Sequence, residues 1–77
     1  MAPKKAVKHL PLAPIYRIIK DAGAERVSDE ARVRLAYHME RFATAVSKRA
    51  VELAKHAKRK TVTRDDIEMA VESVWRR

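Results

Sequence analysis

The sequence predicts an all-α protein built of a short, a long and a short helix, and three observations support this. The 77 residues include one glycine, three prolines and no asparagine, residues on which sheet-rich folds rely for their turns. Apolar residues recur at helical spacing along three segments of the chain. No glycine or proline interrupts the middle segment, which extends from Asp29 to Ala57.

The first expected helix is short and begins near two prolines. Pro11 and Pro14 suit a first helical turn, where a missing N–H group is harmless. Gly23 stands where a left-handed residue usually ends a helix. Between them the apolar side chains repeat every three or four residues, at Leu12, Ile15, Ile18, Ile19 and Ala22.

The central expected helix runs from about Asp29 to Ala57 and would be ~40 Å long at 1.5 Å per residue. Ser28 is its expected N-cap, and Asp29 and Glu30 place favourable negative charge in the first turn. Its apolar stripe consists of Leu35, Met39, Phe42, Val46, Ala50, Leu53 and Ala57. A second series repeats every seven residues and would permit close helix approach, at Ala36, Ala43, Ala50 and Ala57.

The last expected helix opens at Thr63, with Asp66 three residues on in the capping-box position. An unbroken apolar stripe follows, formed by Ile67, Ala70, Val71 and Val74. Two short helices cannot cover a long helix that is apolar along its whole length, and an exposed stripe would favour aggregation. Thirteen of the apolar residues are alanine, which limits the core of one chain. We therefore expect an obligate homodimer in which two long helices cross.

Charge and composition limit the kinds of partner that the protein can bind. Eighteen basic and ten acidic residues give a net charge of +8, which predicts binding to a polyanion. No cysteine is present to form a disulfide. The chain has no apolar run of ~18 residues and no signal-peptide pattern, so we expect an intracellular protein without a membrane span. Residues 1–9 carry three lysines and little to bury, and we expect a flexible basic tail before a single domain over residues 10–77.

Both expected loops place a cation and a β-branched residue beside a helix N-terminus. Arg26 precedes Val27 in the first loop, and Lys60 comes shortly before Val62 in the second. Helix N-termini favour phosphates, and the valines could pair as a small ladder between two chains. The alternative is that Arg26 and Lys60 are ordinary solvated cations. Because no aromatic residues are interleaved with the basic ones, duplex backbone contact fits better than single-strand stacking.

Two segments resemble the archaeal-type histones, LPLAPIYRIIKDAGAERVSDEA and AKHAKRKTVTRDDIEMAV, and the likeness covers residues 10–77 without a gap. The resemblance implies the histone fold, dimerised head to tail, with each loop pairing with the other loop of the partner. It further implies a chromosomal protein of the nucleoid that binds, wraps and compacts double-stranded DNA without reading its sequence. The histone octamer wraps DNA in this manner, with arginines inserted into the minor groove wherever it faces the protein. The residues expected to contact DNA are Arg17, Lys20, Arg26, Ser28, Lys60, Thr61 and Arg64.

The resemblance also implies protein contacts. Arg59 and Asp66 would form a buried ion pair within one chain that ties the second loop to the last helix. Dimers would join through a four-helix bundle into a superhelical fibre, and a sister histone could replace one chain of a dimer. Gly23 would allow successive turns of the fibre to stack. The residues expected where dimers join are Leu53, His56, Asp66 and Met69, with His56 facing Asp66 of the next dimer. Without the resemblance, His56 would be taken as a partly exposed helical histidine.

Three positions depart from the family pattern. Tyr16 stands where glycine is common, beside Arg17, and could alter the wrapping of DNA. His38 occupies the apolar stripe, where we expect a core-edge histidine with a local partner. Trp75 follows the apolar stripe of the last helix, and we expect it to pack on the long helix or to lie at a frayed end.

Other classes of function fit the residues less well. A histone-fold subunit of a transcription-regulatory complex is the main alternative, although Arg26, Lys60, Thr61 and the charge of +8 argue against it. A basic amphipathic protein of membrane surfaces is a second. An enzyme is the weakest, because no nucleophile, base and oxyanion site come together. The three histidines lack metal-ligand spacing, so we expect no metal and no cofactor.

Overall fold

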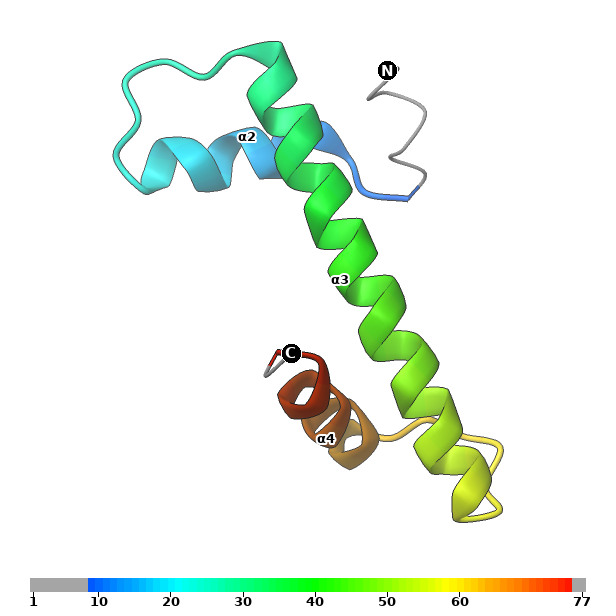
Figure 1. Cartoon of the computed structure of the whole chain (residues 1–77). Helices are drawn as coiled ribbons and strands as arrows, with labels where there is room; N and C mark the ends of the chain where they lie inside the picture. The colour runs from blue at the N-terminus through cyan, green and yellow to red at the C-terminus, as the bar shows by residue number, and fades with distance from the viewer. Residues whose placement is uncertain (1–8, 76–77) are drawn as a thin grey trace. The chain divides into compact units, whose positions relative to one another are not determined.

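The computed structural model describes residues 9–75, which form three helices without a strand (Figure 1). Helix α2 spans Leu12–Asp21, α3 spans Asp29–His56 and α4 spans Arg64–Trp75. Their lengths of 10, 28 and 12 residues confirm the predicted all-α, short–long–short order. The expected tail over residues 1–9 lies outside the described residues except for His9. The chain divides into two compact units at Arg41 and Phe42, and α3 runs through both.

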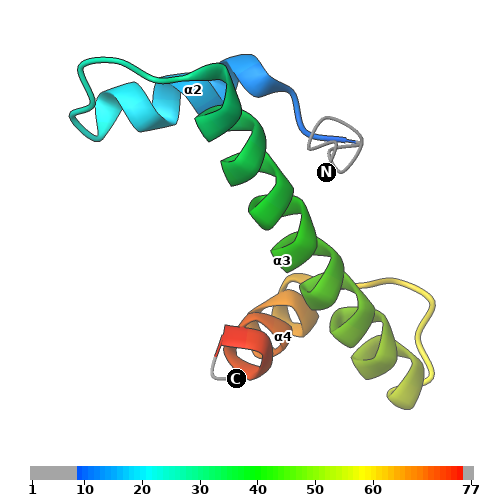
Figure 2. The same ribbon diagram turned by 45° about the horizontal axis from the view of Figure 1, so that its top comes forward.

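The first unit packs α2 against the N-terminal turns of α3 (Figures 1 and 2). Its buried apolar residues are Ile15 on α2 and Val33 and Ala36 on α3. The carboxylate of Glu40 accepts hydrogen bonds from the backbone amides of His9 and of Leu10, the latter at 3.1 Å. The chain entering α2 is thereby fixed to α3 by a polar contact as well as by apolar burial.

The second unit packs α4 against the C-terminal part of α3 (Figures 1 and 2). Its core is small, with Val46 and Ala50 on α3 and Ala70 on α4. Four partly buried side chains pack around this core, namely Phe42, Leu53, Val71 and Val74. Trp75 makes an edge contact with Phe42 at 5.4 Å between ring centroids, which confirms the first of the two alternatives for this tryptophan.

The heptad series of alanines is only half buried in a single chain. Ala36 and Ala50 are fully buried, one in each unit, whereas Ala43 and Ala57 are exposed. On α2, Ile18 is 53% exposed although it belongs to the expected apolar stripe. One chain has too little apolar surface to cover all these positions. The periodic pattern therefore includes apolar residues that stay uncovered in a single chain.

Helices α2 and α3 end in the same way. The N–H of Gly23 donates to the Lys20 carbonyl at 2.9 Å, and the next amide, that of Ala24, reaches the Ile19 carbonyl at 3.5 Å. This pair of hydrogen bonds is the Schellman motif, in which the residue after the helix is left-handed. Gly23 has φ +116°, which confirms the predicted role of the only glycine in the chain.

At the end of α3 the left-handed residue is a lysine. The N–H of Lys58 donates to the Lys55 carbonyl and that of Arg59 to the Ala54 carbonyl, both at 2.9 Å. Lys58 has φ +60°, which an L side chain adopts at a cost of roughly 1–2 kcal/mol. The sequence reasoning missed this residue because lysine carries no signal for a left-handed conformation.

These two ends predict opposite effects on stability. Lys58→Gly should raise the free energy of unfolding by roughly 0.5–1 kcal/mol per chain, because glycine removes the left-handed strain at some cost in chain entropy. Gly23→Ala should lower it by roughly 1 kcal/mol, because a Cβ at Gly23 would meet no atom within 4 Å and only the backbone strain remains. Urea unfolding at one fixed protein concentration would measure both, and shifts of the same sign would contradict the prediction.

Candidate nucleic-acid interface

The two loops are built on one plan. In each, five residue steps separate the left-handed residue that ends one helix from the N-cap that begins the next, Gly23 to Ser28 and Lys58 to Thr63. In each, a valine directly precedes the N-cap residue. The loops therefore present their exposed polar residues at matching positions ahead of a helix N-terminus, where free N–H groups and the helix dipole favour anions.

Both N-caps have the predicted geometry. The Ser28 hydroxyl accepts a hydrogen bond from the Ala31 amide at 3.0 Å. At α4, the Thr63 amide donates to the Asp66 carboxylate at 2.9 Å and the Asp66 amide donates to the Thr63 hydroxyl at 3.4 Å. This reciprocal pair is a capping box in which aspartate takes the place of the more usual glutamate.

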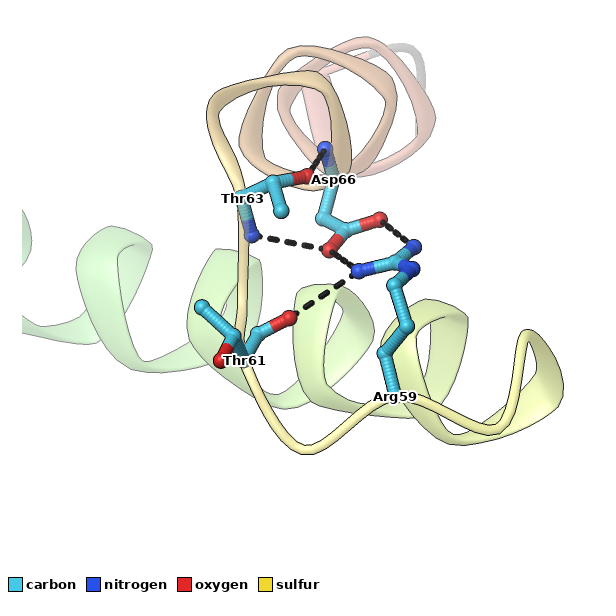
Figure 3. Close-up of polar contacts among 4 residues, drawn as sticks. All are labelled: Arg59, Thr61, Thr63 and Asp66. Atoms are coloured by element: carbon cyan, nitrogen blue, oxygen red, sulfur yellow. Dashed lines mark hydrogen bonds and ion pairs between the residues drawn. The ribbon is translucent and has the colours of Figure 1, made fainter.

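The same carboxylate anchors the second loop (Figure 3). Arg59 binds Asp66 through two parallel hydrogen bonds, from Nη1 to Oδ2 at 2.8 Å and from Nη2 to Oδ1 at 2.9 Å. Nη1 also donates to the Thr61 carbonyl oxygen at 2.9 Å. The Asp66 side chain is 5% exposed and that of Arg59 is 39% exposed. One carboxylate thus holds the loop backbone, the arginine and the start of α4 together.

This geometry shifts the pKa values of both side chains. The Arg59 guanidinium, assisted by the Thr63 amide, holds the pKa of the Asp66 carboxyl well below its usual range, although burial acts in the opposite direction. The carboxylate in turn raises the pKa of Arg59. Two charge-assisted hydrogen bonds in parallel fix the direction of the guanidinium as well as its charge. Arg59 is consequently occupied within its own chain, despite its place in the most basic segment.

The expected DNA-contacting residues of the first unit lie on α2, in the first loop and at the N-cap of α3. Arg17 is exposed on α2, and Arg26 is exposed within the loop itself. Lys20, in the last turn of α2, donates from Nζ to the Glu25 carbonyl at 2.6 Å and so links that helix to the loop. The Ser28 hydroxyl is exposed but is used in capping. Arg26 therefore stands between a basic helix end and the N-terminus of α3.

The remaining expected DNA-contacting residues surround the second loop. Lys60 and Thr61 are exposed, and Arg64 is the exposed first residue of α4. The Thr61 carbonyl is held by Arg59, which fixes the backbone at this residue. The pairing of Val27 with Val62 of a second chain stays a prediction.

Two of the four residues expected where dimers join line a shallow hollow in the second unit. Leu53 on α3 and Met69 on α4 border a space of about 250 Å³, together with Arg49, Glu72 and Ser73. Met69 is 60% exposed, a large value for an apolar side chain. His56 is exposed in the last turn of α3, whereas Asp66 is buried on its arginine.

Two of the departures from the family pattern make local contacts. The Arg32 guanidinium lies over the Tyr16 ring at 5.5 Å from its centroid and also binds Asp29 at 2.7 Å, so Tyr16 contributes to the packing of α2 on α3. His38 has the expected local partner, since it makes an edge contact with Tyr37 at 5.2 Å, but it is exposed in the single chain and does not lie at the edge of its core. Among residues 9–75, no group of three or more His, Cys, Asp or Glu could hold a metal ion. Within the same range, no helix is both long and apolar enough to cross a membrane.

The Arg59–Asp66 pair predicts a pH-dependent stability. Because the pKa of Asp66 is lowered on folding, the pair stabilises the protein fully above the ordinary aspartate pKa of about 4 and is lost as the pH falls further. Arg59 stays protonated across this range and adds no pH dependence there. Asp66→Asn should lower Tm by several degrees at pH 5–8, and its deficit against the original protein should shrink below pH 4.

Asp65→Asn is the matched control for this measurement. Asp65 lies in the same first turn of α4 but is exposed and makes no ion pair among the described residues. Its loss should change Tm only slightly and without the same pH profile. Equal and pH-independent effects of the two variants would contradict the assigned role of Asp66.

Comparison with known proteins identifies the family. Residues 8–71 match the family model described as histone-like transcription factor (CBF/NF-Y) and archaeal histone. The chain is 52% identical over 64 residues to one subunit of the archaeal histone HAN1 of Thermococcus zilligii, covering 83% of this chain and 96% of that protein. It is 48% identical over 62 residues to probable archaeal histone 3 of Methanocaldococcus jannaschii, covering 80% and 92%.

These matches confirm the resemblance and, because both relatives are named as archaeal histones, they indicate a histone and not an enzyme. The three helices and the pair of matching loops are the structural counterpart of that relationship. The chain belongs to the family of histone-like transcription factors and archaeal histones, as a dimerising, DNA-binding protein of chromatin.

Proposed function

We propose that this histone wraps and compacts double-stranded DNA as a head-to-tail homodimer, and that the dimers join into a superhelical fibre on the nucleoid. The observation that carries the proposal is the common plan of the two loops, each of which leads into a capped helix N-terminus. Exposed cations stand at both loops, with Arg26 and Arg17 in the first unit and Lys60 and Arg64 in the second. These groups suit phosphates, and no base-reading element is needed.

Arg26 is the residue proposed to enter the minor groove. It is exposed, and the described residues give it no ion-pair partner, so its guanidinium is available to DNA. In the head-to-tail dimer, Thr61 of the second chain would lie alongside and hold the guanidinium. Wrapping of this kind selects bendable sequences and not particular bases.

Different observations support the formation of the dimer and the joining of dimers. One chain leaves apolar positions exposed, such as Ile18 on α2 and Ala43 on α3, and a second chain would cover them. The hollow bordered by Leu53 and Met69 supports a contact between dimers. At this contact His56 would face Asp66, whose carboxylate already accepts three hydrogen bonds from its own chain. For stacking of fibre turns, Gly23 has open space beyond its Cα.

The alternative is a histone-fold subunit of a regulatory complex, or a heterodimer with a sister histone. The family description includes transcription factors, and one relative is named as one of the subunits of its histone. A heteromeric protein would still bind DNA through its loops, but it would not form a growing series of homodimers.

Nuclease digestion of the protein on long DNA tests the polymeric fibre. Protected fragments should lengthen in regular steps, and His56→Ala should shorten the series while the dimer stays folded. His56 is the cleaner variant because Asp66→Ala would also release Arg59. A single short footprint with the pure protein would exclude the fibre and favour the regulatory complex.

Arg26→Ala tests the DNA surface itself. The variant should bind a short duplex more weakly, and the slope of log K against log salt should fall by about 1 for each phosphate that Arg26 neutralises. Lys48→Ala removes one exposed cation from α3, away from both loops, and is the charge-matched control. An unchanged slope for Arg26→Ala would show that this residue does not bind DNA.

A further inference from the structure

One basic cluster on α3 has no part in the surface described so far. The Arg34 guanidinium lies over the Tyr37 ring at 4.8 Å from the ring centroid, and the Arg41 guanidinium lies over it at 5.7 Å. Arg41 Nη1 also donates to the Tyr37 hydroxyl at 3.3 Å. We call these three residues the Arg34–Tyr37–Arg41 cluster.

The cluster occupies its own side of α3. Residues three, four and seven apart share one side of a helix. The buried Val33 and Ala36 mark the side that is covered within the first unit. The expected dimer stripe follows another side, through Leu35, Met39 and Phe42. The cluster repeats at three and seven residues on the remaining side, where Arg41 is exposed and Arg34 and Tyr37 are half-buried.

The charge of this cluster is not neutralised within the described chain. Two other arginines of α3 bind carboxylates on the same helix, Arg32 with Asp29 at 2.7 Å and Arg49 with Glu52 at 3.0 Å. Between residues 9 and 75, neither Arg34 nor Arg41 has such an ion pair. Two positive charges close together on one short stretch repel each other, so their juxtaposition favours an anionic partner.

Contact with the Tyr37 ring holds both guanidiniums in place for that partner. A guanidinium that lies over an aromatic ring uses the face of its plane and keeps most of its in-plane N–H donors. Those donors match the oxygen atoms of a phosphate in a bidentate geometry. The tyrosine therefore limits the freedom of the two arginines and reduces the entropy that binding would otherwise cost.

We propose that the Arg34–Tyr37–Arg41 cluster is a second binding surface for the phosphate backbone of duplex DNA, by which the protein holds a DNA segment other than the one on its loops. The Tyr37 ring already has two guanidiniums near it and an edge contact with His38, so it is not an open platform for a nucleobase. The backbone of a duplex is thus favoured over the bases of a single strand. This inference rests on the proposed function, because it takes duplex DNA as the partner.

The test is a bridging experiment with the full-length protein. A duplex fixed to beads captures a second, labelled duplex through the protein, and the affinity for a free duplex of about 30 base pairs is measured in parallel. The double variant Arg34→Ala with Arg41→Ala should lower capture about tenfold, the scale expected when two charge-assisted donors to phosphate are removed. Its affinity for the short duplex should change less than about threefold, because the loop surface is intact.

The matched control is Lys48→Ala with Lys55→Ala. These two lysines are exposed on the same helix, seven residues apart as Arg34 and Arg41 are, and they lack an aromatic partner among the described residues. The control should keep capture near the original level. An equal loss in control and double variant would show that overall charge holds the second duplex and would overturn the proposal.

Tyr37 provides a readout that does not alter charge. Tyr37→Leu should lower capture several-fold because the stacking that orients both arginines is gone, whereas Tyr37→Phe keeps the ring and should retain most of it. Unchanged capture in the arginine double variant would overturn the proposal. This holds also if that variant loses binding to an acidic polypeptide such as polyglutamate, because the cluster would then bind protein and not DNA. The two proposals are tested separately. Weaker short-duplex binding by Arg26→Ala, whether or not capture also falls, tests the loop surface, whereas the arginine double variant tests the cluster.

Discussion

A helix of 28 residues flanked by helices of 10 and 12 is the constraint on which the rest of this structure depends. Within one chain, α2 covers part of α3 in the first unit and α4 covers part of it in the second. The buried residues are accordingly few and mostly small, with alanines at positions 36, 50, 54 and 70 and no large side chain fully buried among those described. Because hydrophobic stabilisation scales with the apolar area removed from water, a second chain must supply much of it.

The loops have a different role, since each must connect two helices, begin the next helix with a cap and leave a cation free. In the second loop, one carboxylate both holds the connecting backbone and caps the helix. Asp66 caps α4 through Thr63 and holds the loop backbone through Arg59. The Arg59 guanidinium is thereby bound within its own chain although it is 39% exposed, while Lys60 next to it is exposed and has no ion pair among the described residues. Two adjacent basic residues thus have separate roles that their positions in the sequence do not reveal.

Much of the fold could be predicted from the residues, and the exceptions have physical causes. Ser28, Thr63 and Asp66 are recognisable because capping needs particular side chains at fixed spacing, and Gly23 because a left-handed residue is cheapest as glycine. Lys58 could not be recognised, since its conformation is set by the Schellman hydrogen bonds and not by its own preference. The Arg34–Tyr37–Arg41 cluster could not be recognised either, because a tyrosine between arginines on a helix is usually only part of a solvated surface.

The net charge of +8 is also unevenly divided, and its division bears on which surface meets DNA. Helix α4 contains Asp65, Asp66, Glu68 and Glu72 against one basic residue, Arg64, which gives 1 − 4 = −3. The other 65 residues therefore carry 8 + 3 = +11. Beyond its first residue, α4 would repel a phosphate backbone, while α2, α3 and the second loop, which together carry +6, would attract it. The acidic helix is thereby left for contacts with protein, and the exposed Met69 on it, beside the hollow shared with Leu53, is the apolar surface such a contact would need.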